Sequence, residues 1–177
     1  MRTALRLACA LAVTALVATP AFAQKADIKA ETLKDWADMK ATFVKITNEM
    51  PEDKFTFKST PAQRNYGEHA LHAAGANLNF LKTLGGKTPA PEVNLKATSK
   101  AEIIKAVEAS FDFGTAIINE MTPDQMLEQV KVPPFMGGMS SRSRVIDFLL
   151  SHTWDTYGQM VVYLRLNGHV PPASQRP

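Results

Sequence analysis

Four long segments of the chain carry apolar residues at alternating steps of three and four, and proline or glycine stands at most of their ends. This spacing places the apolar side chains on one face of an α-helix, so it predicts amphipathic helices that pack together. The first such stripe lies between residues 27 and 50 and consists of Trp36, Met39, Phe43, Ile46 and Met50. No segment shows the strict alternation expected of a strand. The chain is therefore predicted to be all-α, a four-helix bundle.

The ends of the other helices follow from capping residues and helix breakers. The second helix is predicted from Thr60-Pro61 to about Leu84, the third from Ser99 to about Met121, and the last from about Ser141 to Leu166. Thr122 and Gln125 predict a short helix by the capping-box pattern. Residues 132–138 are rich in proline and glycine and predict a loop. The segment 136–139 at its end could be a mobile lid over a site or a plain connector.

The linker between the second and third helices favours an unusual topology. It spans 14 residues, from Gly85 to Thr98. Fully extended, these residues could reach ~46 Å, whereas a 24-residue helix is only ~36 Å long. A simple up-down bundle would need only a short loop here, so we predict a long crossover that runs helix three parallel to helix two.

The N-terminus has the layout of a secretory signal peptide. Arg2 and Arg6 precede an apolar run from Leu7 to Val17, and the small residues of the 21–23 segment follow. The apolar run is too short for a membrane span, which needs ~20 apolar residues. We therefore expect residues 1–23 to be removed and residues 24–177 to form one periplasmic or secreted domain, with no membrane contact after cleavage.

Composition excludes several classes of function for the mature chain. The single cysteine, Cys9, lies in the signal segment, so disulfides, thiolate nucleophiles and cysteine-based zinc sites are excluded. Without Arg2 and Arg6, 18 basic residues face 17 acidic ones. No basic run interleaved with aromatic residues is present, so no nucleic-acid partner is expected.

Histidines are the strongest candidates for chemistry. His72 and His152 each lie about 100° from the centre of the apolar stripe of their helix, on the shoulder of the core face. His69 lies nearer the middle of its stripe, where a structural role is expected. Since facing helices of a bundle can assemble metal sites, the two His-bearing helices predict a candidate site. Periodicity alone does not select His72 over His69.

Two stretches of the chain resemble the DinB family. The first comprises residues 50–61 and the run Arg64-Asn65-Tyr66-Gly67-Glu68, followed by His72. The second runs from His152 through Asp155-Thr156-Tyr157-Gly158-Gln159 to the segment 163–172. Together they cover nearly the whole mature chain in order. The resemblance implies a four-helix bundle with a crossover, which agrees with the topology predicted above.

The resemblance also implies a divalent metal, zinc or nickel, held by three histidines. His72 and His152 match two of these positions, but the third position, four residues after His152, is occupied by Thr156. His69, Asp155 or a water molecule held by Thr156 could complete the site. A hydroxyl is a poor substitute for an imidazole, so the metal is expected to be weakly bound or absent.

Three functions remain open at this stage. The chain could be an exported metal-site protein, and the resemblance to thiol-dependent transferases suggests one such activity. It could instead be a non-catalytic member that binds a small molecule, or a stress-related interaction bundle without a pocket. Thr156 favours ligand binding over catalysis. No catalytic residue is assigned, and enzyme activity is undecided. The chain could also form a homodimer.

Overall fold

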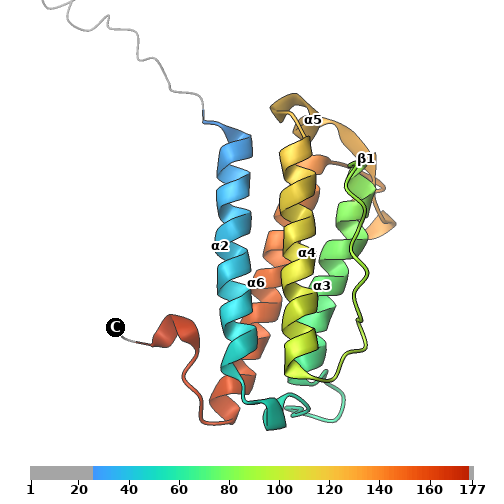
Figure 1. Ribbon diagram of the computed structural model, residues 1–177. Coiled ribbons are helices and arrows are strands. Elements are labelled where there is room, and N and C mark those ends of the chain that lie inside the picture. The colour runs from blue at the N-terminus through green and yellow to red at the C-terminus, as the bar shows by residue number, and fades with distance from the viewer. Residues whose placement is uncertain (1–25, 176–177) are drawn as a thin grey trace, which may run out of the picture.

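The computed structural model describes residues 26–175, and four long helices form its body (Figure 1). They are α2 (Ile28–Glu49), α3 (Tyr66–Leu81), α4 (Lys100–Glu120) and α6 (Arg142–Leu166). α2 packs against α4 and α6, and α3 packs against the same two helices. The predicted four-helix bundle is confirmed. The predicted signal peptide and its cleavage site lie outside the described residues.

The predicted crossover is also confirmed. In Figure 1, α3 and α4 run in the same direction, and α2 and α6 run in the opposite one. The segment after α3 and its 3-10 extension η2 (Lys82–Leu84) descends along the bundle before α4 begins. The Glu120 carboxylate fixes the start of this crossover segment, because it accepts hydrogen bonds from the backbone N–H groups of Lys87 and Thr88.

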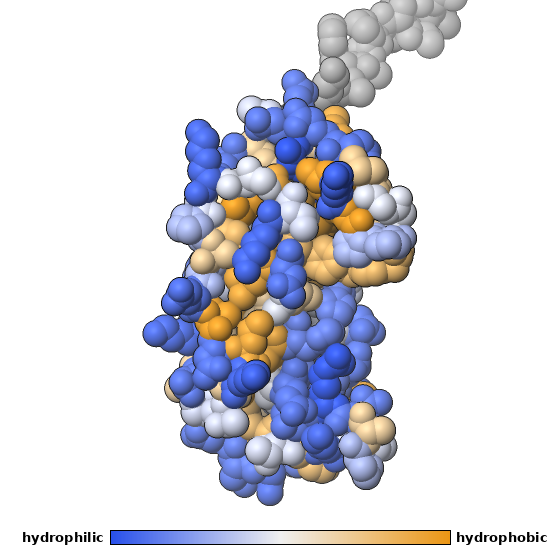
Figure 2. Space-filling model, turned by 90° about the vertical axis from the view of Figure 1, so that its right-hand side faces the viewer, coloured by the Kyte–Doolittle hydropathy of each residue, from blue (hydrophilic) through white to orange (hydrophobic). Residues whose placement is uncertain are grey.

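The crossover covers part of α3. Leu95 lies over Gly75, where an added Cβ would reach van der Waals contact with the Leu95 side chain at 3.4 Å. On the face shown in Figure 2, hydrophobic residues form separate patches among hydrophilic ones. Within residues 26–175, no helix is both long enough and apolar enough to cross a membrane.

The core is built from the predicted stripes. All five members of the α2 stripe and all six of the α6 stripe (Ile146, Leu149, Thr153, Tyr157, Met160 and Leu164) are buried. Phe80 shares the helical face of Tyr66, Ala70, Ala73 and Asn77, which are buried, but it is only partly buried itself. Its ring lies instead against the rings of Phe135 and Phe148, outside the main core.

The predicted start of the second helix is wrong. α3 begins at Tyr66, not at Thr60-Pro61, and residues 59–63 form turns. Asn65 caps the helix by accepting a hydrogen bond from the Glu68 backbone N–H, and the Glu68 carboxylate accepts one from the Asn65 backbone N–H. This reciprocal capping box gives a hydrogen-bond partner to two backbone N–H groups at once. A turn that contains Pro61 and has no such partner cannot do this.

Two short strands that the sequence did not predict flank the predicted loop of residues 132–138. β1 (Gln129–Lys131) and β2 (Met139–Ser141) pair in antiparallel register after the short helix α5 (Pro123–Leu127), with Val130 opposite Ser140. The hairpin they form encloses a 3-10 turn, η3 (Pro134–Met136), and Gly137 and Gly138 adopt positive φ angles that glycine tolerates best. Strands of three residues are too short to show alternation in the sequence.

Candidate metal and ligand site

His72 of α3 and His152 of α6 meet where these two helices pack together. Their ring centroids lie 4.9 Å apart, and the rings are arranged edge to face with an interplanar angle of 77°. Both side chains are partly buried. The structure therefore brings together the two residues that the sequence placed on the shoulders of their helices.

The surroundings keep both imidazoles uncharged near neutral pH. Burial lowers the pKa of His72, and the Arg64 guanidinium lowers it further. Burial also lowers the pKa of His152, although the Asp155 carboxylate opposes this shift. A neutral imidazole keeps one nitrogen lone pair free, so each ring can accept a hydrogen bond or bind a metal.

Thr156 does not supply a third strong ligand. It is 1% exposed, and its hydroxyl donates a hydrogen bond to the backbone carbonyl of His152 at 3.0 Å, one turn earlier in α6. Asp155 is exposed, and its carboxylate accepts a hydrogen bond from the Gln159 amide at 2.8 Å. Both side chains are therefore engaged within their own helix.

His69 is a core residue. It is 1% exposed, and its ring packs edge to face against Tyr163 at a centroid distance of 5.0 Å. Its Nε2 atom is buried without a hydrogen-bond partner. Burial, with Arg64 and His72 nearby, lowers the pKa of His69. This agrees with the structural role that its position in the stripe predicted.

The donor set does not fit a tightly held catalytic metal. Such sites normally use three protein ligands and one open position. Among residues 26–175, no three histidine, cysteine, aspartate or glutamate side chains come close enough to hold an ion together. Two imidazoles remain, and a divalent ion bound by them alone would be held weakly.

A pocket opens directly beside the two histidines, between α3, α6 and η3. Its volume is about 350 Å³, near the small end of the range for ligand sites. Its lining residues are His72, Gly75, Ala76, Asn79, Phe80, Phe135, Phe148 and His152. Apart from the histidines, none of these was predicted as a site residue. Phe148 could have been found, because it lies four residues before His152 on the same helical face.

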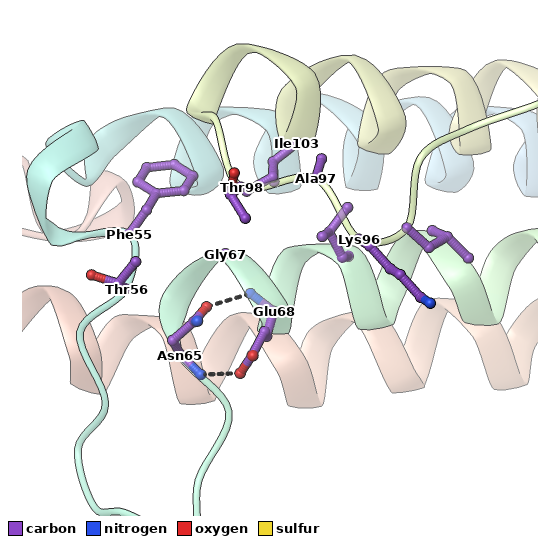
Figure 3. Close-up of a pocket in the computed structure, with 11 residues that line it drawn as sticks. Phe55, Thr56, Asn65, Gly67, Glu68, Lys96, Ala97, Thr98 and Ile103 are labelled. Atoms are coloured by element: carbon purple, nitrogen blue, oxygen red, sulfur yellow. Dashed lines mark hydrogen bonds between the residues drawn. The ribbon is translucent and has the colours of Figure 1, made fainter.

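Another pocket, of about 270 Å³, lies near the N-terminal ends of α3 and α4 and contains no histidine (Figure 3). Phe55, Leu71 and Ile103 contribute to its apolar wall. Two of its polar side chains, Asn65 and Glu68, are committed to the capping box of α3, drawn as dashed lines in Figure 3. Its other polar side chains are Thr56, Lys96 and Thr98, none of which was predicted as a site residue.

The fold and the paired histidines define a helical bundle with a candidate site between antiparallel helices. The DinB family model matches residues 22–177, and the chain belongs to this family. It is similar to a DinB-like protein from Bacillus cereus, with 21% identity, a TM-score of 0.67, and coverage of 80% of this chain and 93% of that one.

A DinB-like protein from Bacillus subtilis has the same fold. Its structure matches with 13% identity and a TM-score of 0.63, covering 83% of this chain and 99% of that one. At these identities the likeness to the two solved structures concerns the fold alone. No curated protein matches the sequence.

Proposed function

We propose that this DinB-family protein is exported and binds a small organic molecule in the pocket beside His72 and His152. The observation that carries the proposal is the pair of imidazoles, 4.9 Å apart, at the wall of a pocket with no third strong metal ligand. A divalent ion, zinc or nickel, binds this pair only weakly. No catalytic residue is assigned.

The pocket supports ligand binding over the other functions considered. A mostly apolar cavity with a few convergent polar groups is the usual form of a small-molecule site. Here the polar groups include two imidazoles that burial keeps neutral, each with a donor and an acceptor. An interaction bundle without a pocket would not need this arrangement, and a metal enzyme would need a third ligand.

Export rests on the N-terminal sequence. The basic residues, the short apolar run and the small residues before Gln24 are arranged as in a cleaved secretory signal. The match to the family model begins at residue 22, beside the expected cleavage site. In the periplasm or outside the cell, the protein would meet its ligand without the thiol cosubstrates of the cytoplasm.

Two measurements test the proposal. Elemental analysis of tag-free protein should find far less than one zinc or nickel ion per chain. An NMR screen of the same protein with a fragment library should shift the backbone signals of residues that line the pocket. One tightly held ion per chain would contradict the proposal and show that His69, Asp155 or water completes a metal site.

A pair of variants locates the binding. Ala76 lines the pocket, so Ala76→Phe should fill part of it and abolish the shifts. Ala41→Phe places the same side chain on an exposed position of α2 and should leave them intact. Shifts that persist in Ala76→Phe would place the ligand elsewhere.

A further inference from the structure

We propose that the ligand is a planar, uncharged aromatic compound with one hydrogen-bond donor, of the phenol class. This inference rests on the proposed function, because it names the ligand class of the same pocket. It follows from the aromatic rings of the wall, the exposure of one of them, and the position of the two imidazoles.

Three phenylalanines form one wall of the pocket. The centroid of Phe80 lies 5.2 Å from that of Phe148 and 6.2 Å from that of Phe135, and those of Phe135 and Phe148 lie 6.0 Å apart. These separations fall in the range at which aromatic rings attract each other through offset and edge-to-face contacts. A flat aromatic ligand could add a further ring to this cluster.

Phe135 is the most exposed large hydrophobic residue of the described chain, at 71%. It lies in η3, between β1 and β2, on a segment followed by two glycines with positive φ. Leaving a phenylalanine side chain in water forfeits about 1.5–3 kcal/mol relative to its burial. A ligand that covers this ring would recover part of that free energy, so the exposure of Phe135 favours a ligand with an apolar face.

The imidazoles provide the polar end of the pocket. The ring of His152 is stacked over Phe148, with an interplanar angle of 6° and centroids 6.0 Å apart, so it continues the aromatic wall. His72 meets it edge to face. An imidazole with one protonated nitrogen keeps a lone pair on the other, so either ring can accept a hydrogen bond from a phenolic hydroxyl. No aspartate, glutamate, lysine or arginine lines the pocket, which disfavours a charged ligand.

Three probe compounds test the ligand class. They are 2-naphthol, naphthalene, which lacks the hydroxyl, and decahydro-2-naphthol, which keeps the hydroxyl but lacks the aromatic rings. Each is titrated into full-length mature protein, and NMR shifts give the dissociation constants. We expect 2-naphthol to bind most tightly. The dissociation constant of naphthalene should be about threefold to tenfold higher than that of 2-naphthol. That of decahydro-2-naphthol should be higher by about threefold or more.

A matched pair of variants tests the wall. Phe135→Ala should weaken 2-naphthol binding about fivefold or more. It should leave the unfolding midpoint nearly unchanged, since the side chain is largely exposed. Trp154→Ala removes another exposed aromatic residue that does not line the pocket, and it should leave binding unchanged.

The outcomes separate the ligand class from the proposed function. Equal binding of 2-naphthol and decahydro-2-naphthol would overturn the aromatic class, as would unchanged binding in Phe135→Ala. Either result would leave small-molecule binding in place, provided that Ala76→Phe abolishes it. If the three probes and the fragment library all fail to shift pocket residues, both proposals fall.

Discussion

Trp36 of α2 lies directly against Gly114 of α4, so that an added Cβ on Gly114 would overlap the indole ring. The indole Nε1 donates a hydrogen bond to the backbone carbonyl of Phe111 at 2.9 Å, one turn before Gly114. The rings of Trp36 and Phe111 are also in contact, with centroids 5.1 Å apart. The absence of a side chain at Gly114 therefore leaves the space that the fully buried Trp36 indole occupies between α2 and α4.

Gly114→Ala should destabilise the protein. Alanine is better than glycine in a helix interior by about 1 kcal/mol, but the rigid indole has no exposed space into which to move. Overpacking of this kind costs about 1–3 kcal/mol, so we expect a net loss in the free energy of unfolding by urea. Gly158→Ala on α6 is the control, because its Cβ would meet no atom within 4 Å. A Gly114→Ala protein as stable as Gly158→Ala would contradict this packing.

Acidification should destabilise the fold through its histidines. Burial lowers the pKa values of His69, His72 and His152 below the ordinary histidine value of 6.5. The unfolded chain then binds more protons than the folded one at pH values just below 6.5, so the free energy of unfolding falls as pH decreases through this range. Urea unfolding at pH 7.5 and pH 5.5 measures the difference.

His69 should contribute to this pH dependence because it is buried most deeply. The charged groups that act on it are Arg64 and a protonated His72, which oppose its protonation, and Glu68 and Asp155, which favour it. His69→Gln should reduce the loss of stability between the two pH values. An identical pH dependence in wild type and His69→Gln would show that His69 does not titrate differently on unfolding.

Thr156→His should create the missing third imidazole. Residue 156 lies one turn after His152 on the same face of α6, the spacing at which two side chains can bind one ion. We expect zinc affinity, measured by titration calorimetry, to rise about tenfold or more. Adding His72→Ala should abolish the gain. Because residue 156 is buried, circular dichroism must confirm the fold, and a folded variant with unchanged affinity would show that the three side chains do not converge.

Removal of the signal segment should leave Gln24 at the N-terminus. The small residues Ala21 and Ala23 provide the pattern that signal peptidase requires. Intact mass of the protein recovered from an envelope fraction gives the cleavage site directly. A mass that still includes residues 1–23 would contradict the expected cleavage.

Local signals allowed most of the fold to be predicted. The α2 stripe and the predicted helix starts near residues 27, 99 and 141 depend on neighbours within one or two helical turns. The structure has N-caps at these positions, namely Asp27, Ser99 and Ser141. The crossover was predictable because the length of a linker limits how far it can reach. The pairing of His72 with His152 was anticipated from the resemblance to the DinB family, since periodicity alone did not select His72 over His69.

The errors arose where distant segments decide the outcome. Thr60-Pro61 is a good local start signal, yet the helix begins at Tyr66, whose N–H bonds to the carbonyl of Phe57. Phe80 fits a core stripe, but the hairpin brings Phe135 against it and makes it part of a pocket wall. Such contacts depend on how separate segments pack, which periodicity within one helix does not record.

The crossover also sets an upper limit on how many residues of this linker can be deleted during evolution. To return from the end of η2 to the start of α4, the linker must cover the length of α3 and η2, about 30 Å. That distance requires at least about nine extended residues. A homologue with a shorter linker would have to reverse α4, and the residue corresponding to Gly114 would then no longer face Trp36 at the same level. Deletions in this segment are therefore limited to a few residues, even though most of it lies on the surface.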